Sequence, residues 1–167
     1  MLQQTQVSRV AARYLAFLDA FPTATRCAEA PAAAVIRLWD GLGYNRRARN
    51  LHRAAAHLAE RHGGRVPDDL DALLALPGVG PYTARAVLSF AFERDVGVVE
   101  TNIGRVLARA VAGESLSSGG AQRLADDLVP PGRSRAWNLA LMDLGAEVCR
   151  KRDPRCHACP VASTCAW

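Results

Sequence analysis

Four cysteines near the end of the chain carry the clearest chemical signal. They are Cys149, Cys156, Cys159 and Cys165, and they follow the pattern C-x6-C-x2-C-x5-C. Nothing in the sequence indicates an oxidising compartment, where disulfides form, so this cluster favours a bound metal. A structural zinc site usually pairs two short C-x2-4-C knuckles, and this pattern contains only one. Four thiolates equally suit a [4Fe–4S] cluster, so the spacing leaves both groups open and somewhat favours iron–sulfur.

The basic residues form two dense groups. One consists of Arg150, Lys151, Arg152 and Arg155, in the loop between the first two of these cysteines, and the other of Arg46, Arg47, Arg49 and Arg53. A loop held at both ends by a metal keeps its charges in a fixed place, which favours contact with a phosphate backbone. The net charge of +5 permits such a polyanionic partner. A solvated loop or helix face is the alternative for either group.

A short glycine-rich segment offers a second way to hold a phosphate. Residues 76–81 read LPGVGP and separate two helical stretches. Gly78 and Gly80 allow the backbone to come close to a ligand. The helix that begins at Pro81 or Tyr82 presents free N–H groups and the positive end of its dipole to an anion. This is the helix-hairpin-helix arrangement, which grips DNA without reading its sequence; a plain tight turn between helices is the alternative.

Apolar residues recur at helical spacing along nearly the whole chain, so we expect an all-α protein. The expected helices cover about 7–21, 31–39, 45–62, 68–75, 82–92, 102–112, 120–128 and 134–148, and only Val98 and Val99 suggest extended chain. Cys27 stands apart from the other cysteines and is expected to be a small buried hydrophobe. No window reaches the ~18 apolar residues of a membrane span, and no secretory signal is present, so we expect a soluble intracellular protein.

These pieces together resemble the helix-hairpin-helix DNA glycosylases with a C-terminal iron–sulfur loop, and most of all their adenine DNA glycosylase (MutY) branch. The matching segments are LQQTQV at 2–7, GLGYNRRARNLHRAA at 41–55, LPGVGPYTARAV at 76–87, ETNIGRVLAR at 100–109, MDLGAEVC at 142–149 and the four cysteines. The resemblance implies a six-helix lobe at 1–112, with the helix-hairpin-helix at about 68–92. It also implies a cluster lobe completed by 113–167, with a [4Fe–4S] loop at 149–165.

The resemblance also implies a reaction. The family removes adenine mispaired with 8-oxoguanine by hydrolysing the N-glycosidic bond of a base extruded from the duplex. Glu100 matches the carboxylate that stabilises the cationic sugar, and Asn102 matches an asparagine of the same site. Tyr82 matches the position where the endonuclease III branch carries a lysine nucleophile. A Schiff base needs an amine, and Lys151 is the only lysine, so we expect a monofunctional enzyme. Capping the helix near Asn102 is the alternative role for Glu100.

The expected partner is double-stranded DNA with a mispaired or damaged base. Gln4 and Tyr44 match residues that wedge into the stack, and Gln3 matches one that lines the groove; an interface aromatic is the alternative for Tyr44. The other expected DNA contacts are made by basic side chains and by the hairpin: Arg46, Arg49, Gly78, Val79, Gly80, Arg150 and Arg152. We further expect a monomer in the bacterial cytoplasm, associated with the nucleoid.

The sequence departs from the family pattern in three places. The family's catalytic glutamate lies just upstream of the segment that here begins at Met1, so we expect Met1 to be an internal methionine and the chain as written to turn over little. Glu100 replaces the usual aspartate, and its extra methylene moves the carboxylate by roughly 1 Å, enough to cost ~10²-fold in rate. The domain that reads 8-oxoguanine in many relatives is missing from the sequence. A non-catalytic DNA-binding remnant and a glycosylase for another base, such as thymine opposite guanine, are the alternatives.

Overall fold

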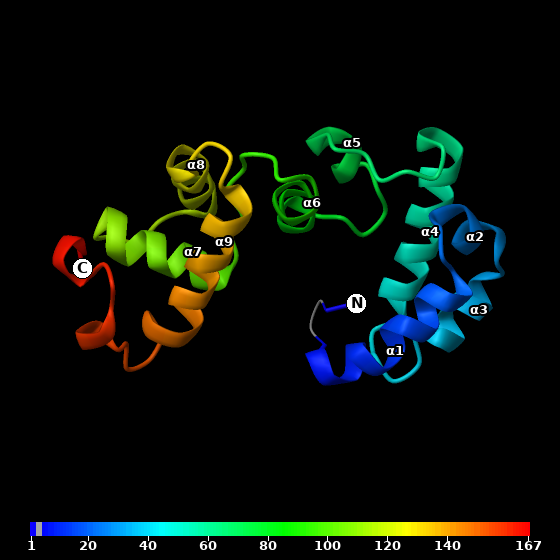
Figure 1. Ribbon diagram of the computed structural model, residues 1–167, viewed down its shortest axis with the longest axis horizontal. Coiled ribbons are helices and arrows are strands. Elements are labelled where there is room, and N and C mark those ends of the chain that lie inside the picture. Colours follow the sequence, from blue (N-terminus) through cyan, green and yellow to red (C-terminus); the bar gives the residue numbers. More distant parts are fainter. Residues whose placement is uncertain (3–4) are drawn as a thin grey trace. The chain divides into compact units, whose positions relative to one another are not determined.

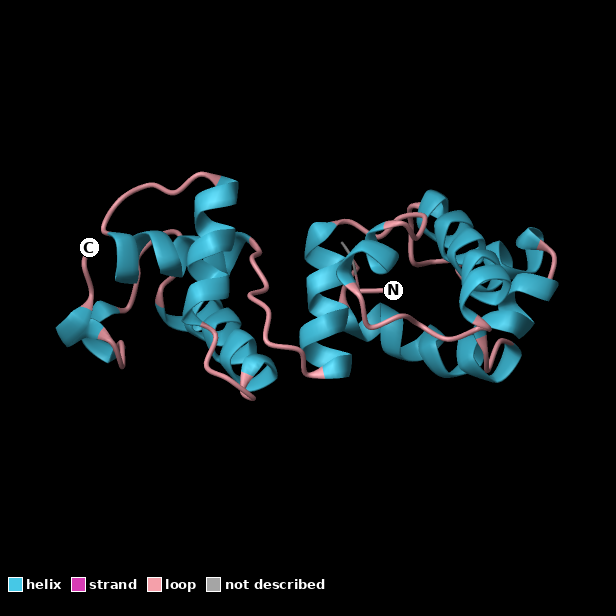
Figure 2. Cartoon of the chain, turned by 90° about the horizontal axis from the view of Figure 1, so that it is seen from above, coloured by secondary structure: helices cyan, strands magenta, loops and turns pink. Residues whose placement is uncertain are grey.

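The structure is a computed structural model that describes residues 1–2 and 5–167. Its described elements are helices joined by loops, which confirms the all-α prediction (Figures 1 and 2). The chain forms two compact units, Met1–Val79 and Gly80–Trp167, and each is described by itself. The lobes predicted at 1–112 and 113–167 divide the chain differently, and that division stays a prediction. Among the described residues, no helix has the length and apolar character that crossing a bilayer requires.

The first unit is built around one long helix. Its elements are α1 (Val7–Ala20), α2 (Ala24–Glu29), α3 (Ala32–Leu38), α4 (Asn45–His62) and α5 (Leu70–Leu74). Helices α2 and α3 pack against α4, and α1 contacts α3 (Figure 1). The short helix α2 falls in a stretch for which the periodicity predicted no helix. Thr23 starts it, because its side-chain oxygen accepts a hydrogen bond from the Arg26 backbone N–H at 3.1 Å.

Aromatic rings fill the core of this unit. The ring of Phe17 meets those of Phe21 and Trp39 edge-on, with centroids 5.1 and 6.3 Å apart. Cys27 lies in the same cluster and is 5% exposed, which confirms the prediction that it is a buried hydrophobe. Burial raises the pKa of the Cys27 thiol, so the side chain stays neutral.

The second unit contains the remaining elements. They are α6 (Pro81–Phe92), α7 (Thr101–Val106), η1 (Leu107–Ala112), α8 (Ser118–Leu128), α9 (Ser134–Asp143), η2 (Leu144–Val148), η3 (Cys156–Ala158) and η4 (Ala162–Thr164). Helix α7 packs on α8 and α9 around Ile103, Leu107 and Ala125. The helices predicted at 102–112 and 134–148 both end in π-helical turns, η1 and η2. A π-helical turn shifts the register of the side chains and is common at functional sites.

An extended segment joins α6 to α7, in agreement with the prediction for Val98. Its backbone groups are satisfied by side chains rather than by a neighbouring strand. Asn138 of α9, which is 1% exposed, accepts from the Val98 N–H at 2.9 Å and donates to the Val96 carbonyl at 2.9 Å. The Gly97 N–H donates to Asp126 of α8 at 2.8 Å. These bonds hold the segment that ends at Glu100.

Replacing Asn138 by alanine is expected to destabilise the second unit by about 2–4 kcal/mol. The change leaves the buried N–H of Val98 without its acceptor, at a cost of about 1–3 kcal/mol, and also removes the bonds of the Asn138 amide to Ser89 and to the Val96 carbonyl, which keeps Ser134 Oγ as a donor. Equilibrium unfolding in urea measures the loss. The exposed Asn45 supplies a matched control, since Asn45→Ala removes an amide that faces solvent. Equal stability of the two variants would refute the role assigned to Asn138.

Candidate functional site

Glu100 occupies the N-cap position of α7. Its Oε1 accepts hydrogen bonds from the backbone N–H groups of Asn102 at 2.8 Å and Ile103 at 2.9 Å. The capping role that the sequence left as an alternative is therefore real. It does not exclude the catalytic role, because capping uses one carboxylate oxygen and fixes the position of the other. A carboxylate held by backbone donors is in place before any charge develops on a ligand.

Tyr82 lies in the first turn of α6, and the pKa of its phenol is raised. Burial raises the pKa of Tyr82, and the nearby Glu100 carboxylate raises it further. The phenol is therefore neutral near pH 7 and can donate a hydrogen bond. Tyr82, eighteen positions before Glu100 in the sequence, thus lies close enough for the charge of Glu100 to act on its phenol.

The raised pKa of Tyr82 predicts a loss of stability at alkaline pH. The folded state holds the phenolic proton more tightly than the unfolded chain, whose tyrosine pKa is about 10. The resulting stabilisation is complete below about pH 10 and is lost as the pH rises through the folded pKa. Tyr82→Phe is expected to remove one of the three tyrosine contributions to the phenolate absorbance, the one that follows the raised pKa, and to flatten the decline of stability there. A titration curve that the substitution leaves unchanged would contradict this.

Asn102 is held in one orientation by Arg105, one turn further along α7. Arg105 Nη2 donates to Asn102 Oδ1 at 2.7 Å and to the Gly145 carbonyl at 2.6 Å, and Arg105 Nε donates to the Cys149 carbonyl at 2.8 Å. Gly145 makes this possible, because a Cβ at its position would lie 2.7 Å from the Cβ of Asn102. Arg105 therefore connects the Glu100–Asn102 turn with the first cysteine of the predicted metal loop.

The four predicted metal ligands line one cavity of about 150 Å³ in the second unit. All four are free thiols, so the disulfide alternative is wrong among the described residues. Within the part of the chain that the structure describes, no three His, Cys, Asp or Glu side chains converge on one point. A zinc ion needs four sulfurs about 2.3 Å from one centre, whereas a cubic cluster binds its thiolates at separate corners. Four thiols around one cavity are a set of donors that either group accepts.

Arg109, in the π turn η1, lies in the wall of this cavity. Its Nη1 is 3.8 Å from Cys149 Sγ and 2.9 Å from the Arg150 carbonyl, to which it donates. Its guanidinium lies 4.1 Å from the centre of the Trp167 ring. Through its bond to the Arg150 carbonyl, Arg109 holds the start of the cysteine loop.

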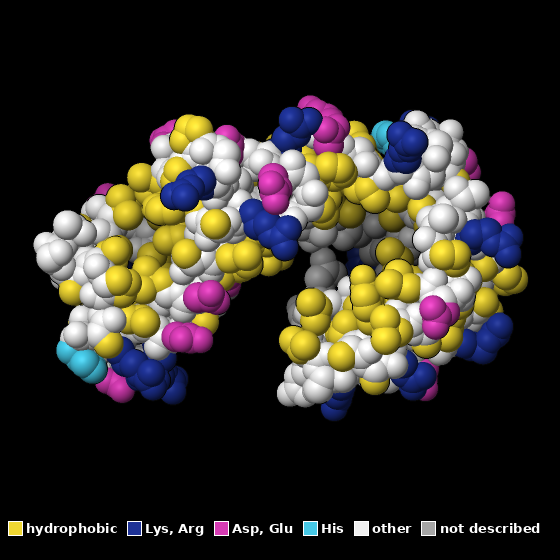
Figure 3. All heavy atoms as spheres, viewed as in Figure 1, with side chains coloured by type: hydrophobic (Ala, Val, Ile, Leu, Met, Phe, Trp, Pro, Cys, Tyr) yellow, Lys and Arg dark blue, Asp and Glu magenta, His cyan; other side chains and the backbone are white. Residues whose placement is uncertain are grey.

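The basic residues of the cysteine loop do not all face solvent alike. Arg150 is tied within the loop, because its Nη2 donates to the Asp153 carbonyl at 2.8 Å and lies 3.2 Å from the Asp153 carboxylate. Lys151, Arg152 and Arg155 are exposed. On the face visible in Figure 3, the described Lys and Arg side chains lie in separate groups among hydrophobic ones. Arg152 is therefore better placed than Arg150 to meet a phosphate.

The glycine-rich hairpin has the predicted local form. Gly78 has a φ of +83°, and a Cβ at this position would lie 2.7 Å from the Cβ of Asn50 on α4, so only glycine fits. Val79 N–H donates to the Leu76 carbonyl at 3.1 Å and closes the turn. Gly80 is the N-cap of α6, and no atom of the described residues lies within 4 Å of where its Cβ would be. The backbone is thus open to a ligand at Gly80.

The predicted wedge residues are only partly described. Gln3 and Gln4 lie outside the described residues. Tyr44 is 65% exposed and has a left-handed backbone, with a φ of 53°, at the start of α4. Arg46 and Arg49 follow it and are exposed, as a contact with phosphate requires.

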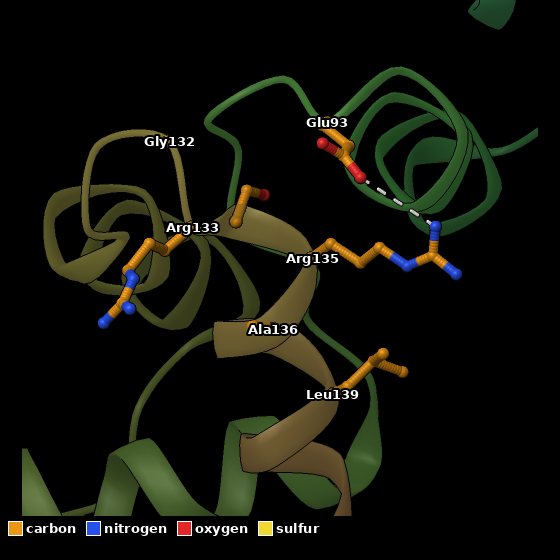
Figure 4. A pocket seen from close by; sticks show the side chains of 7 residues that line it. Glu93, Gly132, Arg133, Arg135, Ala136 and Leu139 are labelled. Atoms are coloured by element: carbon orange, nitrogen blue, oxygen red, sulfur yellow. Dashed lines mark ion pairs between the residues drawn. The ribbon is translucent and has the colours of Figure 1, made fainter.

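A second hollow, of about 350 Å³, lies at the start of α9 and contains none of the predicted site residues. Its Arg135 pairs with Glu93 at 3.9 Å. Arg133 points away from Arg135 in Figure 4, so the two guanidinium groups do not form one anion site.

Comparison with known sequences identifies the family. The pattern of the HhH-GPD superfamily base excision DNA repair protein family matches residues 1–131. The chain belongs to this family. The adenine DNA glycosylase of Mycolicibacterium smegmatis is 46% identical over 170 residues, which make up 100% of this chain and 58% of that protein. The human adenine DNA glycosylase is 43% identical over 171 residues, or 99% of this chain and 31% of that protein. The chain thus spans little more than half of one relative and about a third of the other.

Solved structures of the family confirm the predicted fold. A thermostable thymine-DNA glycosylase superposes with a TM-score of 0.91 at 33% identity, covering 98% of this chain and 78% of that one. A trapped covalent intermediate of endonuclease III with DNA superposes with a TM-score of 0.84 at 25% identity, with the same coverage of both chains. The helix-hairpin-helix glycosylase fold and the resemblance to the adenine branch, both inferred from the sequence, are therefore correct.

Sequence reasoning missed two residues of this site, Arg105 and Arg109. Both lie in the segment ETNIGRVLAR, at one and two turns after Asn102. Their helical spacing places them on the face that carries Asn102, and this was the available signal. What they bind could not be inferred, because their acceptors lie about forty residues further along the chain.

Proposed function

We propose that this chain carries the sugar-side catalytic centre of a monofunctional DNA N-glycosylase that removes adenine mispaired with 8-oxoguanine or guanine. The observation that carries the proposal is the Glu100 carboxylate. Its Oε1 is held by the backbone N–H groups of Asn102 and Ile103, its charge raises the pKa of Tyr82, and Arg105 holds the side chain of Asn102. This arrangement occurs in a chain whose relatives at 43–46% identity are adenine DNA glycosylases.

The proposed reaction assigns a separate task to each group. Cleavage of the N-glycosidic bond builds positive charge on the sugar, which the fixed Glu100 carboxylate stabilises without having to reorganise. Arg105 takes no part in proton transfer; it holds the Asn102 side chain by donating to Asn102 Oδ1. Tyr82 stands at the position where the endonuclease III branch carries an amine nucleophile. Without that amine no Schiff base forms, and water completes the hydrolysis. In the family pattern, the acid that protonates the base precedes the segment at 1–7.

We propose that Cys149, Cys156, Cys159 and Cys165 bind a [4Fe–4S] cluster. The arrangement of four free thiols around one cavity, with Arg109 in its wall, supports this. When bound, the cluster supplies a rigid cross-link for the loop at 149–165. Iron and acid-labile sulfide in equal amounts, with a brown colour, are the expected result; stoichiometric zinc in a colourless protein would overturn it.

Duplex DNA is the proposed partner, contacted by Tyr44, Arg46, Arg49, the hairpin at 78–80 and the loop with Arg150 and Arg152. Exposure of Arg46, Arg49 and Arg152 and the open backbone at Gly80 support this. Because phosphate contacts release counterions, the affinity should fall steeply with salt. Salt-independent binding would count against the assignment. A monomer is proposed for the free protein, which sedimentation can test.

Single-turnover excision assays test the function. The chain is compared with an N-terminally extended form that includes the family's glutamate, on duplexes with A:8-oxoG, A:G, T:G and A:T pairs. The extended form is expected to excise adenine opposite 8-oxoguanine and guanine and to spare A:T. Borohydride should trap no efficient covalent adduct, and efficient trapping would show a lyase instead.

Thymine excision from T:G pairs is the second candidate, because a thymine-DNA glycosylase superposes with a TM-score of 0.91. Activity on T:G without activity on A:8-oxoG would establish it. Binding without excision by either form would establish the third alternative, a non-catalytic DNA-binding module.

A further inference from the structure

Arg47 belongs to the basic group of α4, but its guanidinium contacts its own chain. Nη1 donates to the Met1 carbonyl at 2.9 Å, and Nη2 donates to Thr5 Oγ1 at 2.6 Å. Nη2 also lies 2.9 Å from the Leu42 carbonyl and 3.2 Å from the Gly43 carbonyl, both of which accept from it. Thr5 Oγ1 in turn donates to the Leu42 carbonyl at 3.0 Å. Arg47 therefore ties the start of the chain to the loop before α4.

The same guanidinium contacts two aromatic rings. Its Cζ lies 5.3 Å from the ring centre of Trp39 and 5.6 Å from that of Tyr44. Trp39 is 2% exposed and is anchored by its Nε1, which donates to the Gly43 carbonyl at 3.1 Å. Tyr44 is exposed, so Arg47 links a ring that is fixed in the core to a ring that faces solvent.

Tyr44 needs such a link because its backbone is strained. It adopts a φ of 53° and a ψ of 65°, the left-handed region, which costs a non-glycine residue on the order of 1 kcal/mol. Strain of this kind persists only where the surroundings hold the residue in place. Arg47 does so from both sides, through the two preceding carbonyls and through its own N–H, which donates to the Tyr44 carbonyl at 2.8 Å.

We propose that Arg47 is a positioning residue that holds the Tyr44 ring and Thr5 in one arrangement, so that the ring can insert into a duplex. The proposal rests on the proposed function, because the contact of Tyr44 with DNA is itself proposed. Arg46 and Arg49 are exposed and suit phosphate. Arg47 is half-buried, and its Nη1 and Nη2 groups donate to four acceptors of its own chain. The basic group of α4 thus contains two kinds of arginine.

A measurement without DNA tests the positioning. The protein is labelled with 3-fluorotyrosine, and the fluorine line of Tyr44 is assigned with Tyr44→Phe. In Arg47→Lys, which keeps the charge but not the fork of donors, this line is expected to move most of the way toward its position in unfolded protein. Arg61→Lys, at the exposed far end of α4, should leave the line in place. If Arg47→Lys fails to fold, Thr5→Val removes one acceptor and is expected to shift the line in the same direction.

A double-mutant cycle then tests the consequence for DNA. The probe is a duplex with a central A:G mispair, with the A:T duplex as reference. Tyr44→Ala is expected to weaken mispair binding about tenfold, since stacking on one aromatic ring is worth about 1–3 kcal/mol. Arg47→Lys is expected to cost about threefold, and the double variant no more than Tyr44→Ala, because both act through one ring. The salt dependence should be unchanged in Arg47→Ala, which removes the charge, and shallower by about one unit in Arg46→Ala.

The outcomes separate the two proposals. The inference is overturned if the Tyr44 line does not move in Arg47→Lys. It is also overturned if the losses of mispair affinity in the double-mutant cycle are independent and Arg47→Ala has a shallower salt dependence, since Arg47 would then be a phosphate contact. A shifted line with no effect of Tyr44→Ala on mispair binding would support the positioning and overturn the wedge role of Tyr44.

Discussion

Replacing Glu100 by glutamine is expected to lower the single-turnover rate of adenine excision by the extended protein about 10²–10³-fold, the usual cost of removing one group that stabilises transition-state charge. Glutamine keeps an oxygen that can accept from the N–H groups of Asn102 and Ile103, so the cap of α7 is retained. What is lost is the negative charge opposite the developing cation of the sugar. The measurement is the rate of abasic-site formation on an A:8-oxoG duplex.

Two further variants separate the charge from the cap. Glu100→Asp keeps the charge and a side-chain oxygen for the cap, and restores the residue usual in the family, so its rate should be at least that of the parent and up to about 10²-fold higher. Glu100→Ala loses both, and about 1 kcal/mol of stability in addition. An excision rate that survives Glu100→Gln would remove Glu100 from the catalytic centre and leave it a helix cap.

Replacing Arg105 by leucine is expected to destabilise the second unit by about 3 kcal/mol or more. Three acceptors lose their partner at once, namely Asn102 Oδ1 and the carbonyls of Gly145 and Cys149. Bonds from a charged donor contribute about 1.5–3 kcal/mol each, although such losses are not additive within one network. For a chain of this length, the expected fall in Tm is about 10 °C. Thermal and urea unfolding of the metal-loaded protein measure it.

The same substitution should also lower the excision rate and the retention of iron, because Arg105 joins the Asn102 turn to the backbone of Cys149. We expect slower excision and faster loss of iron to a chelator from one variant. Arg123→Leu is the matched control, since Arg123 is exposed on α8. If Arg105→Leu lowers the free energy of unfolding by less than about 1 kcal/mol, or releases iron no faster than Arg123→Leu, the hydrogen bonds of Arg105 do not stabilise this part of the structure.

Local chemistry accounts for what sequence reasoning predicted correctly. Helical periodicity predicted nearly every long helix, because an apolar stripe must face a core wherever that core lies. The hairpin was predictable at Gly78, where a left-handed backbone and contact with Asn50 both exclude a side chain. Helix α2 was missed, since six residues between short loops show too little periodicity to recognise.

The roles of the arginines were not predictable in the same way. Arg47 and Arg46 are neighbours in one basic run, yet Arg47 binds its own chain and Arg46 faces solvent. Arg150 was expected on DNA, a role that stays a prediction, and its guanidinium also binds Asp153, three residues away. A guanidinium binds carbonyl oxygens and phosphates equally well, so its type does not reveal its acceptor.

The sequence by itself determined the family, the all-α fold, the four cysteines and the position of Glu100, because each depends on residue type and spacing along the chain. Only the tertiary structure decided that one oxygen of Glu100 caps α7 and that the charge of Glu100 raises the pKa of Tyr82. It also decided that Arg105 and Arg47 bind acceptors in distant parts of the chain. The acceptors of Arg105 at Gly145 and Cys149 lie forty or more residues away, and those of Arg47 in the first five residues lie more than forty away. Folding alone brings such groups within hydrogen-bonding distance, and no local pattern records the encounter.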